Sequence, residues 1–174
     1  MSLLKQPLLI LTLAASLAVS ACGFTPVHAP GGSGHALYGT VDIARPDLPD
    51  ASGDQNAYFL VRDLEQRLGR SSNGPYKLDL TLSTRQEGQA ITADNSITRY
   101  SIIGAAGYSL VRQSDGVVLA SGSETSFTGY SATGSTVETL AGERDAFERL
   151  MRILADQIAA RLLATADLAT PAAE

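Results

Sequence analysis

The amino-acid sequence predicts an α+β fold: a two-layer sandwich in which two helices cover one face of a four-stranded mixed sheet, in the order β-α-β-β-β-α. Two stretches with apolar residues at helical spacing, at residues 53–69 and after Ser135, enclose segments in which apolar and polar residues alternate. Strict alternation indicates a sheet with one buried and one wet face. We therefore expect both helices on the apolar face.

The first strand is predicted over residues 38–44, where apolar and polar side chains alternate before two proline-containing breaks. The first helix follows, with Ser52 and Gln55 spaced as in a capping box and Gly69 as its end. Because a right-handed crossover through this helix would join parallel strands, the next strand should run parallel to the first.

Three further strands should form an antiparallel meander. The second strand is predicted over 76–83, with a polar loop between it and the third strand over 97–112. A tight turn at 114–116 then leads to a fourth strand over 117–127. The predicted buried face of the second strand consists of Tyr76, Leu78, Leu80 and Leu82.

Gly104 and Gly107 lie inside the predicted third strand, with two alanines between them. Glycine weakens a strand, and its usual explanation is a bulge or a closely approaching backbone. A helix crossing over the strand accounts for these small residues, and a ligand groove is the alternative.

Residues 121–136 include nine serines and threonines in sixteen positions, which predicts the end of a hairpin and a long, mobile loop. Ser135 and Glu138 then have capping-box spacing and begin a long amphipathic helix. Its predicted apolar stripe consists of Leu140, Phe147, Leu150, Met151, Leu154, Ile158 and Leu162.

Residues 1–21 have the pattern of a secretory signal peptide: Lys5, a 12-residue apolar stretch, and small residues before Cys22. The apolar stretch is shorter than the roughly 20 residues that a membrane-spanning helix needs. The Val-Ser-Ala-Cys run resembles a bacterial lipobox, which predicts that Cys22 carries the lipid anchor. Because Gly23 rather than Asp follows, the resemblance implies the outer membrane.

Residues 22–37 are predicted to be the anchor and a flexible tether, 38–165 a single domain, and 166–174 a disordered tail. The tether contains His28 and His35, but no cysteine or carboxylate partner lies near them, so no metal site is expected.

Composition excludes several classes of protein. A single cysteine excludes a disulfide scaffold, and a net charge of −5 argues against nucleic acid as a partner. Without residues 1–21 the chain has 12 basic and 18 acidic residues, a net charge of 12 − 18 = −6. The mean hydropathy of +0.05 is that of a foldable domain.

Catalytic residues and cofactors are not expected. The sequence contains no G-x-S-x-G elbow, phosphate loop, H-E-x-x-H or C-x-x-C motif. The predicted domain contains no histidine, the usual general base. The carboxylate pairs Asp63/Glu65 and Glu143/Asp145 are spaced i,i+2 on predicted helices, so their side chains diverge.

Several short motifs follow one another along the chain: Cys22-Gly23-Phe24-Thr25-Pro26, Tyr76-x-Leu78-x-Leu80, Thr98-Arg99-Tyr100 with Ala106-x-Tyr108-x-Leu110, Tyr130-Ser131 before the segment 141–146, and Leu154-Ala155-x-x-Ile158. Together they resemble the lipopolysaccharide (LPS) assembly lipoprotein family LptE of alphaproteobacteria. The similarity extends to about Leu163, and the glycine-rich stretch 31–34 departs from it.

This resemblance implies a non-enzymatic lipoprotein held by its lipid in the inner leaflet of the outer membrane. It implies a plug inside the lumen of the LptD β-barrel that assists the assembly of the barrel and contacts LPS in transit. Within that picture Arg85 and Arg99, which flank the predicted polar loop, are the candidates for binding LPS phosphates. The alternative is an auxiliary periplasmic lipoprotein of a lipid-transporting ABC system, or an activator of a peptidoglycan synthase.

Overall fold

The computed structural model describes residues 27–29, 32–46, 48, 51–91, 96–166 and 168. Within these residues the chain forms four strands and three helices. They are α2 (Ser33–Leu37), β1 (Val41–Ile43), α3 (Ala51–Leu68), β2 (Tyr76–Ile91), β3 (Ile97–Arg112), β4 (Val118–Ser131) and α4 (Thr136–Thr165). The predicted signal peptide and Cys22 lie outside the described residues.

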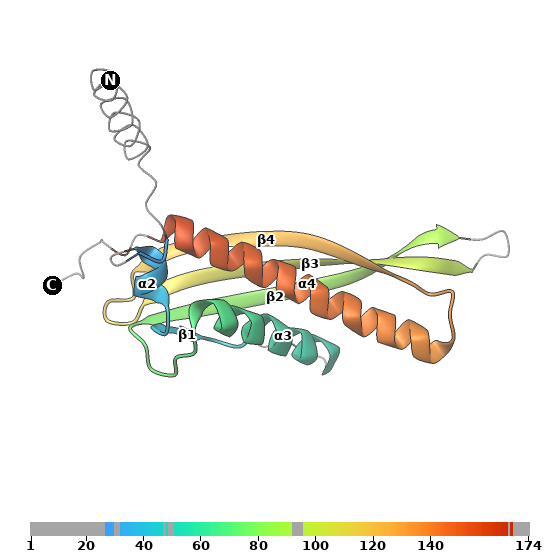
Figure 1. Ribbon diagram of the computed structural model, residues 1–174, viewed down its shortest axis with the longest axis horizontal. Coiled ribbons are helices and arrows are strands. Elements are labelled where there is room, and N and C mark those ends of the chain that lie inside the picture. Colours follow the sequence, from blue (N-terminus) through green and yellow to red (C-terminus); the bar gives the residue numbers. More distant parts are fainter. Residues whose placement is uncertain are drawn as a thin grey trace, which may run out of the picture.

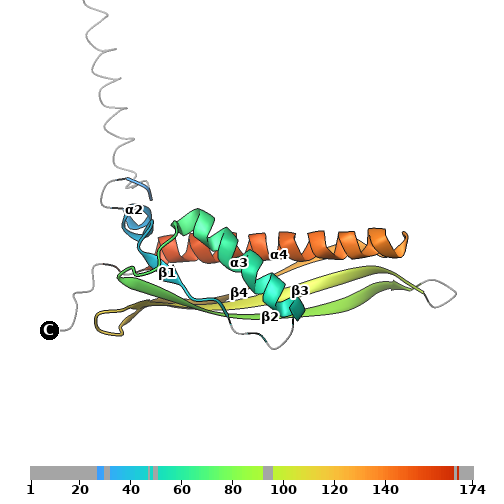
Figure 2. The same cartoon turned by 90° about the horizontal axis from the view of Figure 1, so that it is seen from below.

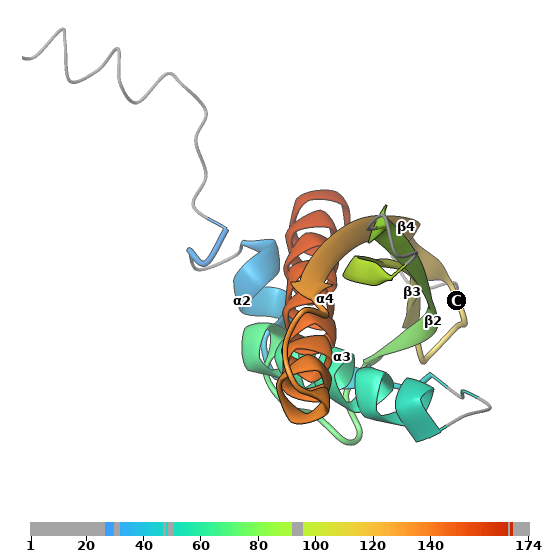
Figure 3. The same ribbon diagram turned by 90° about the vertical axis from the view of Figure 1, so that its right-hand side faces the viewer.

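The strands lie side by side in the order β1-β2-β3-β4. Strand β1 pairs with β2 in parallel, whereas β2–β3 and β3–β4 are antiparallel. Helix α4 runs lengthwise over β3 and β4, and α3 packs beside it (Figure 1). Both helices lie on one face of the sheet (Figure 2), and the sheet curves around α4 when viewed end-on (Figure 3). The predicted α+β class and mixed sheet are confirmed.

The core lies between the sheet and the two long helices. The leucines of the alternating β2 pattern are buried, as predicted, and so is most of the α4 stripe. Each such side chain contributes about 1.5 to 3 kcal/mol by leaving water. The largest fully buried members are Leu37, Leu60, Leu64, Leu68, Leu78, Ile102, Leu110, Leu150, Met151, Leu154, Ile158 and Leu162.

Leu140 is the exception to the predicted stripe, because its side chain is 59% exposed. Helix α4 begins well beyond the first residue of α3, so its first turns have no neighbouring helix (Figures 1 and 2). The helical period identified the correct face of α4, but the length of α3 decided how much of that face is covered.

Strands β2 and β4 are both longer than the sequence predicts. Strand β2 continues to Ile91 through the expected polar loop, and β4 continues to Ser131 through the expected mobile segment. Both extensions pair with β3, in rows such as Arg85, Ile103 and Phe127. The backbone of a polar segment can form hydrogen bonds with a neighbouring strand instead of with water. Pairing with β3 therefore makes these segments strands although their composition is typical of loops.

Residues 33–37 form α2 rather than part of a flexible tether. Leu37 is fully buried, and the hydroxyl of Ser33 donates a hydrogen bond to the carbonyl of Leu163 at 2.6 Å. At the other terminus, Ala166 and Leu168 pack against the core although the tail is predicted to begin at residue 166. Both ends of the domain are therefore packed onto it, and the Ser33–Leu163 hydrogen bond joins α2 to the end of α4.

The two predicted capping boxes differ in outcome. At α4 the box is present, since Ser135 N donates to Glu138 Oε2 at 2.7 Å and Glu138 N donates to Ser135 Oγ at 3.4 Å. At α3 the prediction is wrong, because the helix begins at Ala51 and Ser52 lies inside it. Across the described residues, no helix combines the length and apolar character needed to span a bilayer.

Candidate functional site

The face of the sheet opposite the helices, called the helix-free face below, is the first candidate surface. Its charged groups are largely paired along β2, with Lys77 to Asp79 at 2.7 Å and Arg85 to Glu87 at 2.9 Å. Between them the surface is dominated by hydroxyl groups, namely those of Thr81, Ser83, Ser109, Ser121, Ser123 and Thr125. The predicted wet face is therefore neutral over most of its area.

At one end the hairpin of β2 and β3 projects beyond α4 (Figure 1). Near this projection Phe127 of β4 is 71% exposed on the helix-free face. Ile103 is its cross-strand neighbour, and Arg85 follows in the same row. An exposed aromatic ring beside a cation and hydroxyl groups is an amphipathic surface, suited to a ligand with apolar and anionic parts.

Arg85 and Arg99 lie on this same face, but the structure does not bring them together. Arg85 pairs with Ile103, and Arg99 lies four residues before Ile103 on β3. At about 3.4 Å per residue, their backbones are separated by roughly 13 Å along the sheet. They also do not flank a loop as predicted, because Arg85 lies inside β2.

The two arginines differ in their partners. The Nε of Arg85 donates to Glu87 Oε1 at 2.9 Å, so its charge is already compensated. Arg99 has no ion pair or side-chain hydrogen bond within the described residues. It lines a hollow of about 510 Å³ together with Gln89, Tyr100, Ser101, Phe127, Thr128 and Gly129. Arg99 is therefore the arginine with an available guanidinium, which binds phosphate or carboxylate in bidentate geometry.

The base of the projection is joined to α4 by a hydrogen bond. The rings of Tyr100 and Tyr130 stack with their centroids 5.4 Å apart. Gln86 donates one hydrogen bond to the Tyr130 hydroxyl and another, at 3.3 Å, to Glu143 of α4. Burial, followed by the nearby charge of Glu143, raises the pKa of Tyr130 above its usual value.

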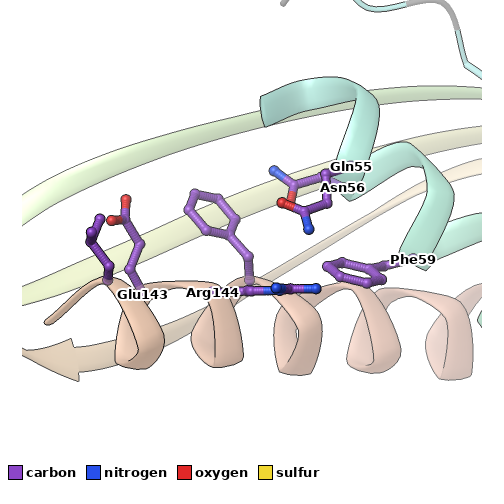
Figure 4. Close-up of a pocket in the computed structure, with 7 residues that line it drawn as sticks. Gln55, Asn56, Phe59, Glu143 and Arg144 are labelled. Carbon is purple, nitrogen blue, oxygen red and sulfur yellow. The ribbon is translucent and has the colours of Figure 1, made fainter. Parts of the chain in front are cut away.

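A second candidate site, missed by the sequence analysis, lies between α3 and α4 on the helical side. It is a cleft of about 200 Å³ whose lining side chains come from both helices (Figure 4). They are Gln55, Asn56 and Phe59 of α3, and Leu140, Glu143, Arg144 and Phe147 of α4. Arg144, like Arg99, has no ion pair within the described residues. The one sequence signal was the place of Leu140 on the apolar stripe.

Neither candidate site resembles a metal centre. The part of the chain that the structure describes contains no group of three or more His, Cys, Asp or Glu side chains arranged to hold a metal ion. What the two sites offer is an unpaired guanidinium next to apolar side chains, which favours binding of an anionic, partly apolar partner.

Comparison with known families identifies the chain. Residues 47–162, two thirds of the sequence, match the model of the family described as LptE, lipopolysaccharide-assembly. The chain belongs to the LptE family. Membership gives it a role in LPS assembly. This confirms the family that the sequence motifs indicated.

Two solved structures of similar fold are described as lipoproteins. A candidate lipoprotein of Caulobacter crescentus CB15 has a TM-score of 0.58 at 16% identity, covering 77% of this LptE chain and 95% of that one. The rare lipoprotein B of Shewanella oneidensis has a TM-score of 0.55 at 13% identity, covering 72% and 94%. At these identities the likeness concerns the fold. A search of curated proteins found no match.

Proposed function

We propose that this chain is an outer-membrane lipoprotein, anchored through Cys22, that serves as plug and assembly partner of an LptD-type β-barrel during LPS transport. Its role is non-enzymatic. It faces the periplasm from the inner leaflet and occupies the lumen of the barrel. Membership of the LptE family supports this proposal, together with a lipobox at residues 19–22.

The helix-free face suits the inside of a barrel. The interior of a large outer-membrane barrel is polar, whereas its outer surface is apolar. A sheet face covered with serine and threonine hydroxyls can exchange its hydrogen bonds with water for hydrogen bonds with such a wall. The compensated pairs Lys77–Asp79 and Arg85–Glu87 add little net charge to that contact.

The hollow around Arg99 is the proposed contact with LPS, and the observation that carries it is the unpaired guanidinium of Arg99 beside exposed Phe127. The guanidinium would bind a phosphate, and Phe127 would contact apolar atoms next to it. Arg85 would contribute after releasing Glu87. Because the chain without residues 1–21 has a net charge of −6, attraction to LPS relies on these local contacts and weakens with salt.

Co-purification under mild detergent tests this function. The full-length lipidated chain, expressed with the LptD-type barrel of the same organism, should retain the barrel through size exclusion. Recovery of an inner-membrane ABC transporter or a peptidoglycan synthase in place of the barrel would contradict the proposal and support the alternative class.

The anchor is tested separately. Replacing Cys22 with serine removes the only thiol that can be acylated, so incorporation of a labelled fatty acid should stop. Normal labelling of Cys22→Ser would show that the lipid is attached elsewhere.

A further inference from the structure

The cleft between α3 and α4 has features that the LPS contact does not use. Leu140 continues the apolar stripe of α4, yet α3 begins too far along α4 to cover it, and the side chain is left exposed. Phe59 and Phe147 are the aromatic side chains that line the cleft with it. The groove between the two helices is therefore open at this end, where a further side chain would complete the packing.

The charges around the cleft indicate which kind of residue should lie next to that side chain in a partner. Arg62, which lies over the Phe59 ring at 5.1 Å, is already paired with Glu148 at 2.9 Å and Asp63 at 3.0 Å. Glu143 accepts its hydrogen bond from Gln86. This leaves the guanidinium of Arg144 at the rim without a counter-ion among the described residues, so an incoming carboxylate would find a partner there.

The size of the cleft favours a protein segment over a lipid or cofactor. Small-molecule sites typically enclose about 300 to 1,000 Å³, whereas this cleft encloses about 200 Å³. That volume accepts one apolar side chain, and amides from Gln55 and Asn56 also line it. Long acyl chains need a longer and more uniformly apolar groove.

We infer that this cleft is the docking point for a segment of the partner barrel, with one apolar side chain between Phe59 and Leu140 and a neighbouring carboxylate paired with Arg144. The inference rests on the proposed function, since it names the surface that holds the proposed partner. The cleft lies on the helical side and Arg99 lies on the helix-free face. The two surfaces can therefore bind barrel and LPS at the same time.

Charge-introducing variants test the docking point in the full-length lipidated chain, co-expressed with the LptD-type barrel. Leu140→Asp and Arg144→Glu should each reduce the amount of barrel retained about tenfold, as expected for residues central to an interface. The control is Arg152→Glu, which reverses an exposed charge on the same helix outside the cleft. It should stay within about twofold of wild type.

The reduced retention of the barrel must not result from unfolding of the two variants. Leu140 and Arg144 are exposed, so the urea midpoints of both variants should match wild type. If either variant unfolds, the retention assay is replaced by a crosslinking experiment. In it, a photo-crosslinking residue is placed at position 140 of the otherwise unchanged chain. A crosslinked product containing the barrel supports the inference, and its absence overturns it.

The outcomes separate the two proposals. Failure of the wild-type chain to retain the barrel contradicts the proposed function itself. Retention of the barrel by wild type and equally by Leu140→Asp and Arg144→Glu overturns only the docking point. If Leu140→Asp or Arg144→Glu lost capture of purified LPS but still retained the barrel, the cleft would be a lipid site. That result would also overturn the docking point.

Discussion

Gly104 of β3 lies directly beneath Leu150 of α4. A β-carbon at Gly104 would lie 3.0 Å from Leu150 Cδ2 and 3.3 Å from Leu154 Cδ1, which is closer than ordinary van der Waals contact. The glycine thus lets α4 approach the sheet. The helix crossing that the sequence predicted is confirmed at Gly104. It does not account for Gly107, where an added β-carbon would lie 2.5 Å from Thr81 Oγ1 on the helix-free face.

Gly104→Val should destabilise the domain by about 1 to 3 kcal/mol, because the added carbons overpack the contact with α4. The matched control is Ala105→Val on the helix-free face of the same strand, where a β-branched residue suits the strand and should cost under about 1 kcal/mol. Urea denaturation of both variants checks this. Equal midpoints would show that α4 can shift away from β3 without cost.

Arg112 and Asp115 form a buried ion pair at the turn between β3 and β4. Arg112 Nη1 donates to Asp115 Oδ2 at 2.9 Å, with side chains only 10% and 7% exposed. Removing one partner leaves the other charge buried, so Arg112→Met should cost about 3 to 5 kcal/mol.

The double variant Arg112→Met/Asp115→Asn removes both charges and should lose less than the sum of the two single variants. Urea midpoints of the three variants measure this coupling. Additive losses would mean that the two side chains act independently.

Arg99→Glu should reduce capture of purified LPS by about tenfold, which corresponds to losing one charge-assisted contact. Arg85→Glu should have a smaller effect, since Glu87 already compensates Arg85. Crosslinking or light scattering with purified LPS measures both, with Arg152→Glu as the control reversal. Added salt should reduce the difference in LPS capture between wild type and Arg99→Glu. Equal capture by all four proteins would exclude this hollow as the LPS contact.

The capping box of α4 should make stability depend on pH. Hydrogen bonds from the backbone and side chain of Ser135 hold the pKa of Glu138 below its usual value. A carboxyl whose pKa is lower in the folded state stabilises the fold above its unfolded pKa, and this contribution disappears as pH falls through the folded pKa.

Glu138→Gln should therefore differ most from wild type near pH 7, and the difference in urea midpoint should shrink below about pH 4. If the difference in urea midpoint stayed constant from pH 7 to pH 3, the charge of Glu138 would not contribute to the stability of the fold.

The elements that the sequence predicted well carry their own local signals. Alternation along residues 76–82 identified the buried leucines of β2, and the Ser135–Glu138 spacing identified the start of α4. Polar extensions of β2 and β4 were missed, because their strand structure comes from pairing with β3 rather than from their own composition. Arg85 was placed beside a loop for the same reason.

By itself the sequence determined the α+β class, the buried faces, the family motifs and the predicted anchor, because periodicity and short motifs are local properties. Only the tertiary structure decided that Arg85 is paired with Glu87 while Arg99 lines an open hollow. It also decided that Leu140 and Arg144 border a cleft. Whether a side chain is paired or available depends on neighbours from other elements, and their positions follow from packing that no single segment encodes.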